Sequence, residues 1–190
     1  ITQRLDYLQS LGIDAIWLNP ICASPNDDNG YDISDYKAIM KEMGTMADFD
    51  EMLAGMKKRN IKLVMDLVVN HSSDEHEWFK GAKSSRDNKY RNYYHWWPAE
   101  KGTPPHRYSL FDENADAWKL DSTTNSYYLH YFSRKQPDLN WENPALRNEM
   151  YDIMKFWAEK GTDGFRLDAF QFVAKDPKFP EFPAGTEPSL

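Results

Sequence analysis

Three short apolar runs, each preceded by a segment with helical periodicity, constrain the fold of this chain most strongly. The runs are residues 13–18, 61–69 and 164–169. Strands this apolar are typical of a parallel sheet that is covered on both faces. Apolar residues recur at helical spacing before each run, in residues 1–11, 45–59 and 143–161. Helix followed by strand, three times over, predicts parallel α/β units.

The two longer helices carry start and stop signals. Thr45 is a typical N-cap, and Asp48 three places later makes a variant of the capping box. Asn143 followed by Pro144 is a favourable N-cap and first helical residue. Gly161 is placed to end that helix. We therefore predict one helix beginning just after Thr45 and another from Pro144 to the residue before Gly161.

Residues 72–140 interrupt this alternation. They are polar, rich in Tyr and Trp, and without helical periodicity, and Thr124-Asn125 between two aromatic stretches is typical of a hairpin turn. A disordered loop of this length would be poor in aromatic residues. We predict an inserted, irregular β-containing subdomain at 72–140, between a first part of the α/β domain at 1–71 and its continuation at 141–190.

Composition excludes several classes of function. The chain has 190 residues, 41% of them hydrophobic, and a net charge of −7 without a basic block, which argues against a nucleic-acid partner. No apolar run approaches the roughly 18 residues of a membrane span, so no membrane partner is expected. The single cysteine, Cys22, excludes an internal disulfide. We expect a cytoplasmic protein that is monomeric in its full-length form. No signal peptide is visible, but secretion stays open as an alternative.

Arg166 and Asp168 stand two places apart in the third run. Alternation along a strand directs both side chains to one face. A guanidinium beside a carboxylate keeps it ionised, lowering its pKa by roughly 1–3 units. An ionised carboxylate held on a rigid strand is what a glycosidase uses as its nucleophile. The pattern is equally typical of a structural ion pair, and these two residues alone do not separate the two interpretations.

Three other polar segments accompany this run, in a fixed order along the chain. They are DNGYD at 28–32, DLVVNH at 66–71 and QPDLN at 136–140. Together with GFRLDAF at 164–170, they resemble the α-amylase superfamily of glycoside hydrolases (glycoside hydrolase family 13). The QPDLN segment is similar to the oligo-1,6-glucosidase and α-glucosidase branch. The resemblance implies a partial TIM (β/α)₈ barrel, about strands 2 to 4, with residues 72–140 as the domain inserted after strand 3 (domain B).

The resemblance also implies roles for individual residues. Asp168 matches the nucleophile of a retaining mechanism, and Arg166 matches the arginine that orients it. The residues that match substrate contacts are Asp28, Tyr31, His71, Phe132, Gln136 and Phe111, although Phe111 departs from the spacing of the family. Asp66 would orient Arg166 without contacting the substrate itself. Asn70 is expected to be structural, with a share in a cation site as the alternative.

Ala169, directly after the expected nucleophile, bears on linkage specificity. Members of the family that prefer α-1,6 bonds tend to carry valine there, and the smaller alanine resembles members that prefer α-1,4 bonds. The difference would arise from pocket shape, where a methyl group or two is worth about 1–3 kcal/mol. The resemblance therefore slightly favours maltose-type over isomaltose-type substrates.

The general acid of the family, a glutamate, is not identifiable in this sequence and is expected beyond Leu190. The chain is therefore expected to be a fragment of a longer enzyme, truncated in the barrel, and inactive by itself. No metal or other cofactor is expected in this chain, and a calcium site is left open for the missing N-terminal part.

The function that these observations favour is a retaining α-glucosidase, which acts on terminal α-glucosidic bonds of short oligosaccharides. A sucrose or trehalose isomerase of the same family is one alternative, because acceptor choice depends on loops outside this sequence. A glucosidase-like, non-catalytic subunit of a transporter is an alternative from another class. Intact Asp168, Arg166 and His71 argue against that second alternative.

Overall fold

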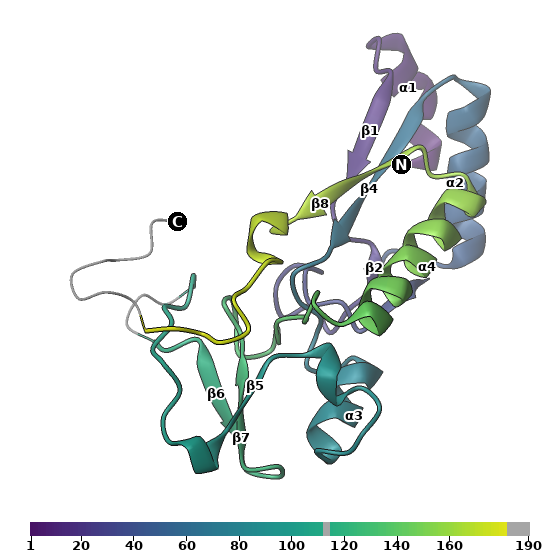
Figure 1. Ribbon diagram of the computed structural model, residues 1–190. Coiled ribbons are helices and arrows are strands. Elements are labelled where there is room, and N and C mark those ends of the chain that lie inside the picture. Colours follow the sequence, from purple (N-terminus) through teal and green to yellow (C-terminus); the bar gives the residue numbers. More distant parts are fainter. Residues whose placement is uncertain (112–114, 182–190) are drawn as a thin grey trace.

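A three-stranded parallel sheet carries the architecture (Figure 1). Its strands are β1 (Ala15–Leu18), β4 (Lys62–Val68) and β8 (Gly164–Asp168), paired in the order β1-β4-β8. The computed structural model describes residues 1–111 and 115–181, so the end of the proline-rich tail lies outside the described residues. All three apolar runs predicted as parallel strands are parallel strands in the structure, each slightly shorter than its run.

The long helices lie side by side along one face of the sheet (Figure 1). They are α2 (Met46–Lys58) and α4 (Pro144–Lys160), with the short α1 (Leu5–Ser10) nearby after a 3₁₀ turn at Thr2–Arg4. Thr45 and Asp48 form the reciprocal capping box, and the Asn143 side chain accepts from Ala145 N. Gly161 ends α4 with a φ of 110° in the left-handed region. The capping signals of the sequence therefore predicted both helix boundaries.

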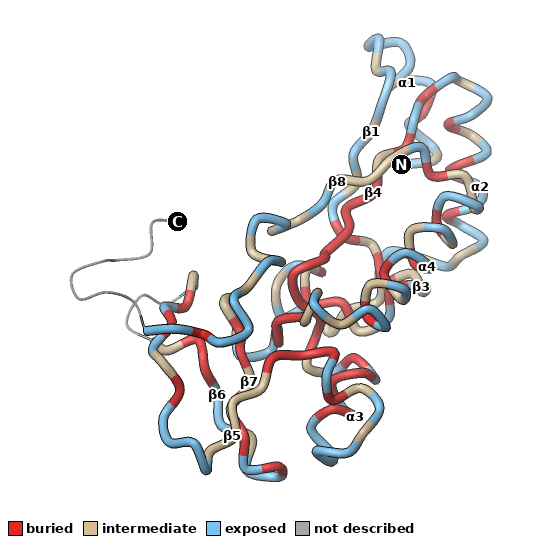
Figure 2. Tube along the Cα trace, in the orientation of Figure 1, coloured by how far each residue is buried: buried red, intermediate tan, exposed pale blue. Residues whose placement is uncertain are grey.

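The sheet is not covered equally along its width (Figure 2). The central strand β4 is buried over most of its length, whereas β1 and β8 are partly exposed, with Trp17 at 49% and Leu167 at 42% exposure. The prediction that the first run is buried on both faces is therefore wrong for this chain. Both strands lie at edges of the sheet, where only one neighbouring strand shields them.

These open edges give a first prediction for the 190-residue chain expressed alone. Two unpaired strand edges and exposed Trp17 and Leu167 favour association between copies. We expect an insoluble product or a molten state without glucosidase turnover. Calorimetry and dye binding test this, and a cooperative melting transition with turnover of an α-glucoside would contradict it.

Residues between β4 and α4 form the inserted part. A second, antiparallel sheet has the order β5-β7-β6, from β5 (Trp96–Pro98), β6 (Trp118–Asp121) and β7 (Ser126–Leu129). The predicted turn at Thr124-Asn125 joins β6 to β7, and Asn125 adopts a φ of 48° there. The sequence shows no helical periodicity in this stretch, yet the stretch contains the helix α3 (Glu77–Ser84). Its eight residues are too few for the periodicity to stand out from the polar sequence around it.

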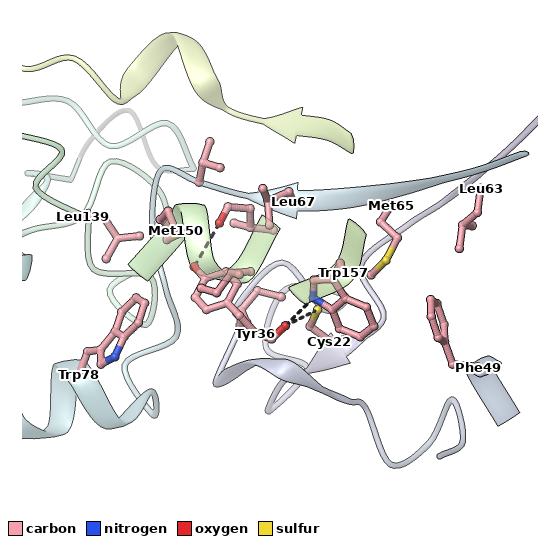
Figure 3. Packing of buried hydrophobic residues seen from close by; sticks show 14 of the residues in the cluster. Cys22, Tyr36, Phe49, Leu63, Met65, Leu67, Trp78, Leu139, Met150 and Trp157 are labelled. Carbon is pink, nitrogen blue, oxygen red and sulfur yellow. Dashed lines mark hydrogen bonds between the residues drawn. The ribbon is translucent and has the colours of Figure 1, made fainter. Parts of the chain in front are cut away.

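The loop after β1 contains two further strands, which form an antiparallel pair. They are β2 (Cys22–Ala23) and β3 (Asp35–Ile39). Tyr36 of β3 is buried and connects three parts of the core (Figure 3). Its carbonyl accepts from Trp157 Nε1 of α4 at 2.8 Å, and its hydroxyl donates to the carbonyls of Val68 and His71. The core therefore fixes the backbone at the carboxyl end of β4, where the polar DLVVNH segment ends.

Candidate active site

The carboxyl ends of β1, β4 and β8 point toward the inserted part (Figure 1). The isolated bridge His71↔Asp138 joins the two parts just after β4, and the bridge Tyr94↔Leu139 lies within the inserted part. Parallel strands place the side chains of their carboxyl ends at one edge of the sheet, which is where α/β enzymes bind ligands. The predicted site residues should therefore meet here, and most of them do.

Arg166 links two carboxylates from neighbouring strands. The register pairs Asp66 with Arg166 and Val68 with Asp168, so all these side chains lie on one face of the sheet. Arg166 Nη1 donates to Asp168 Oδ1 and, at 3.1 Å, to Asp66 Oδ2. The side chain of Asp168 is 17% exposed, and that of Asp66 is fully buried. Asp168 therefore stays accessible, and its orientation is fixed by the guanidinium of Arg166, which the buried Asp66 holds in turn.

Asp66 collects donors from three segments. Besides Arg166, its Oδ2 accepts from Trp17 Nε1 at 3.2 Å and from the Tyr31 hydroxyl at 3.4 Å. Burial raises the pKa of Asp66 to about 6, while the charge of Arg166 opposes the rise. Arg166 also lies over the Trp17 ring, 5.0 Å from its centroid. Asp66 therefore joins β1, β4, β8 and the loop of Tyr31 at one oxygen.

The loop at residues 28–32 is organised by its last residue. Asp32 is fully buried and accepts from Asp27 N, Asp28 N and Ser24 Oγ at 2.9–3.0 Å. Gly30 has a φ of 91°, and a Cβ there would lie 3.1 Å from the carbonyl oxygen of Pro20. The DNGYD motif is thus a tight turn, as its composition predicts. The turn holds Asp28 and Tyr31 beside the strand ends.

The side chain of Gln136 bridges Asp28 and His71. Its Nε2 donates to Asp28 Oδ2 at 2.8 Å and lies 3.1 Å from His71 Nε2. Gln136 is 0% exposed and His71 is 1% exposed, so neither side chain opens directly onto solvent. Burial raises the pKa of Asp28, with a smaller opposing effect of the hydrogen bond from Gln136. The negative charge of Asp168 also raises it, so these two carboxylates share one electrostatic environment.

His71 is uncharged at neutral pH. Burial lowers the pKa of His71 to about 3, more than its hydrogen bond to the backbone of Tyr31 raises it. Its ring packs on Phe132 with centroids 5.0 Å apart, and Phe132 in turn contacts Phe111 and Phe172. Phe111 is 57% exposed and lies at the outer end of this aromatic row. Phe132 therefore contacts His71 directly, and Phe111 reaches this row through Phe132 despite the irregular spacing.

A buried ion pair lies behind His71. Lys175 Nζ is 3.2 Å from Asp138 Oδ2 and donates to Asn70 Oδ1 at 3.0 Å. Asn70 Nδ2 donates to Asp138 Oδ1, which closes a three-residue network. Burial raises the pKa of Asp138 and lowers that of Lys175, and the attraction between their charges opposes both shifts. The cation beside Asn70 is therefore a lysine side chain.

Within residues 1–111 and 115–181, no group of three or more His, Cys, Asp or Glu side chains is arranged to hold a metal ion. Among the same residues, the helices lack the length and apolar character that crossing a bilayer requires.

Ala169 has an unusual backbone for a residue with a Cβ. Its φ of 49° and ψ of 27° lie in the left-handed region, directly after β8. This conformation turns the chain sharply away from the strand into a 3₁₀ turn at Phe170–Phe172. A non-glycine residue with positive φ is uncommon and often marks a functional site. The turn presents the Asp168 carboxylate at the edge of the sheet.

Sequence reasoning missed three residues of this site. Trp17 could have been found, because a polar-tipped aromatic residue stands near the end of an otherwise aliphatic strand. Asp32 had a weaker signal, as an aspartate at the end of a turn motif. Lys175 had none, since it lies seven residues after Asp168 in a polar segment and meets partners that are distant in the sequence.

The geometry suits chemistry at one partly exposed carboxylate, that of Asp168. Asp168 is fixed by a guanidinium, while Asp28 and Tyr31 supply a carboxylate and a phenol near it. A carboxylate so placed can attack an electrophilic carbon, and its neighbours can hold hydroxyl groups. A complete acid–base pair would need a second acid, and no other carboxyl group of the described residues contacts Asp168 as a proton donor.

Comparison with known proteins places these features in context. The family model described as "Alpha amylase, catalytic domain" matches residues 1–188. An oligo-1,6-glucosidase of Parageobacillus thermoglucosidasius is 57% identical over 95% of this chain and 32% of its own length. An alpha-glucosidase of Pediococcus pentosaceus is 53% identical over 96% of this chain and 33% of its own length.

Among solved structures, the trehalulose synthase MutB of Pseudomonas mesoacidophila superposes with a TM-score of 0.91 at 54% identity, over 95% of this chain and 32% of its own. A mutant of MutB in complex with its substrate sucrose gives 0.92 at 53% identity. The chain thus spans about one third of the length of the relatives that it matches.

Proposed function

Because this chain belongs to the α-amylase family, we propose that the protein that contains it is a retaining α-glucosidase, which releases glucose from short α-glucosides. One observation carries the proposal. The Asp168 carboxylate is partly exposed, held by Arg166, and shares its surroundings with Asp28 and Tyr31. A nucleophilic carboxylate next to groups that bind hydroxyls is what a double displacement at a sugar carbon requires.

In this proposal, the three parallel strands are strands 2 to 4 of a (β/α)₈ barrel, and residues 72–140 are the domain inserted after strand 3. The family and the mixed α/β structure support a part of such a barrel. Trp17, Asp66 and Arg166 then face the barrel axis, at the carboxyl ends of the strands where barrel enzymes carry their chemistry.

The proposed reaction gives each residue a role. Asp168 attacks the anomeric carbon of the terminal glucose and forms a glycosyl-enzyme ester, while an acid from another part of the protein protonates the leaving oxygen. Water then attacks the same carbon, and the configuration is retained. Arg166 keeps Asp168 ionised, and Asp28 and Tyr31 contact the bound sugar. Phe132 and Phe111 form an apolar wall, while Asn70 has a structural role through Lys175 and Asp138.

Product analysis tests the proposal. Incubated with maltose and isomaltose, the intact enzyme is expected to release glucose, which proton NMR would detect first as the α-anomer. Release of the β-anomer first, or no release from either sugar, would overturn the assignment. A glucosyl-transferring isomerase is the second candidate, because the similar structures include a trehalulose synthase bound to sucrose. Its signature would be conversion of sucrose into an isomeric disaccharide with little free glucose.

Linkage preference gives a further prediction. The small Ala169 follows Asp168 and favours maltose-type substrates, whereas several relatives are named oligo-1,6-glucosidases. Replacing Ala169 by Val is expected to raise the ratio of kcat/KM for isomaltose over maltose by about 10-fold or more, because one or two methyl groups discriminate by roughly 10–200-fold. Competition assays with the two disaccharides measure this ratio. An unchanged ratio would remove Ala169 from the determinants of linkage.

A further inference from the structure

We infer that Gln136 is a positioning residue, which fixes the Asp28 carboxylate beside the buried ring of His71, and that it does not bind sugar itself. The inference rests on the proposed function. It also revises the expectation that Gln136 contacts substrate, because a residue with no exposed surface cannot line an open pocket.

The orientation of the Gln136 amide is determined by its surroundings. Its Oε1 accepts from Ser133 N at 3.1 Å, so the other end of the amide must be the NH₂ group. That group has two protons and two partners, Asp28 Oδ2 at 2.8 Å and His71 Nε2 at 3.1 Å. All hydrogen-bonding capacity directed at the site is therefore used within the protein.

The contact with Gln136 also places an amide NH₂ group beside the ring of His71. Each ring nitrogen faces such a group: Nε2 lies 3.1 Å from Gln136 Nε2, and Nδ1 lies 3.2 Å from Asn70 Nδ2, which also donates to Asp138. His71 makes a further hydrogen bond to the backbone of Tyr31. His71 thus ties Gln136 to the loop of Tyr31.

The hydrogen bond from Gln136 fixes the orientation of the Asp28 carboxylate. Gln136 occupies Oδ2, and no hydrogen bond to Asp28 Oδ1 exists among the described residues. Asp28 is only half-buried, so Oδ1 is the oxygen left to accept from a sugar hydroxyl. The charged groups that face Asp28 are Asp32 on its own loop and Asp168 on β8, and both repel it. Gln136 counteracts this repulsion with a donor at close range, so its loss should free the Asp28 side chain to turn.

A double-mutant cycle on the intact enzyme tests the inference. Gln136→Leu keeps the volume roughly and removes the donors, and is expected to lower kcat/KM for maltose by about 10- to 100-fold, since a hydrogen bond to a charged group is worth about 1.5–3 kcal/mol. In an Asp28→Asn background, Gln136→Leu should lower kcat/KM by less than about 3-fold, because Gln136 acts through Asp28. If the losses in kcat/KM from the two substitutions multiplied instead, Gln136 would contact the sugar directly, and the inference would be overturned.

Gln136→Glu supplies a second measurement in case the leucine variant folds poorly. A glutamate places a carboxyl group against Asp28, and the pair can share a proton only in acid. The activity of this variant relative to wild type should therefore rise as pH falls from 7 to 5, while Gln136→Leu shows no such recovery. An unchanged pH profile in Gln136→Glu would contradict the positioning role.

Arg134→Ala is the matched control, because this exposed side chain belongs to the same segment and makes no hydrogen bond within the described part of the chain. Wild-type activity is expected for this variant.

The proposed function and the role of Gln136 fail in different ways. Should Asp168→Asn remain active, the proposed function fails; should Asp168→Asn be inactive while Gln136→Leu matches wild type, only the role of Gln136 fails.

Discussion

Asp168→Asn in the intact enzyme is expected to lower kcat for α-glucosides by at least about 10⁴-fold, as removal of a catalytic nucleophile does in other enzymes. The amide has nearly the shape of the carboxylate and can still meet Arg166, but it is a poor nucleophile and cannot form the ester intermediate. Substrate binding should change much less than kcat. Steady-state kinetics with maltose and an activated aryl α-glucoside measure both quantities.

A matched substitution distinguishes loss of chemistry from loss of folding. Asp152 lies exposed on α4, and its side chain makes no hydrogen bond or ion pair among residues 1–111 and 115–181. Asp152→Asn is therefore expected to keep wild-type kinetics and stability. If Asp168→Asn lost only a few-fold in kcat, Asp168 would be a structural partner of Arg166, and the proposed function would have no nucleophile in this chain.

Lys175→Met is expected to destabilise the intact enzyme by about 3–5 kcal/mol, the usual effect of removing one partner of a buried ion pair. The Lys175 side chain is 2% exposed, and without its ammonium group Asp138 would remain buried as an uncompensated charge. Asn70 would lose a donor at the same time. Urea denaturation at pH 7 measures the change in the free energy of unfolding.

Lys178→Met is the control for this change. Lys178 lies three residues later and is exposed, and its side chain makes no hydrogen bond or ion pair with the residues that the structure describes. A surface substitution of this kind is expected to alter stability by no more than about 0.5 kcal/mol. Equal stability of the Lys175 and Lys178 variants would show that the network of Lys175, Asp138 and Asn70 does not stabilise the fold.

Much of the fold was predictable from local signals. The capping pairs at Thr45 and Asn143 predicted helix starts, because the side chains that satisfy free backbone N–H groups lie within three residues of them. The apolar runs predicted all three parallel strands. The helix α3 was missed, since one polar eight-residue helix is stabilised mainly by the core against which Trp78 and Phe79 pack.

The candidate site likewise combines contacts that the sequence predicts with contacts that it does not. Arg166 and Asp168 meet because a strand repeats every two residues, so the sequence alone determined that contact. The partners of Gln136 and Lys175 were decided only in the folded chain, where Asp28 and Asn70 approach from more than one hundred residues away in the sequence. Such contacts depend on how β4, β8 and the inserted part pack together. Local periodicity carries no information about that packing, and so no motif revealed that Gln136 would be buried or that Lys175 would neutralise Asp138.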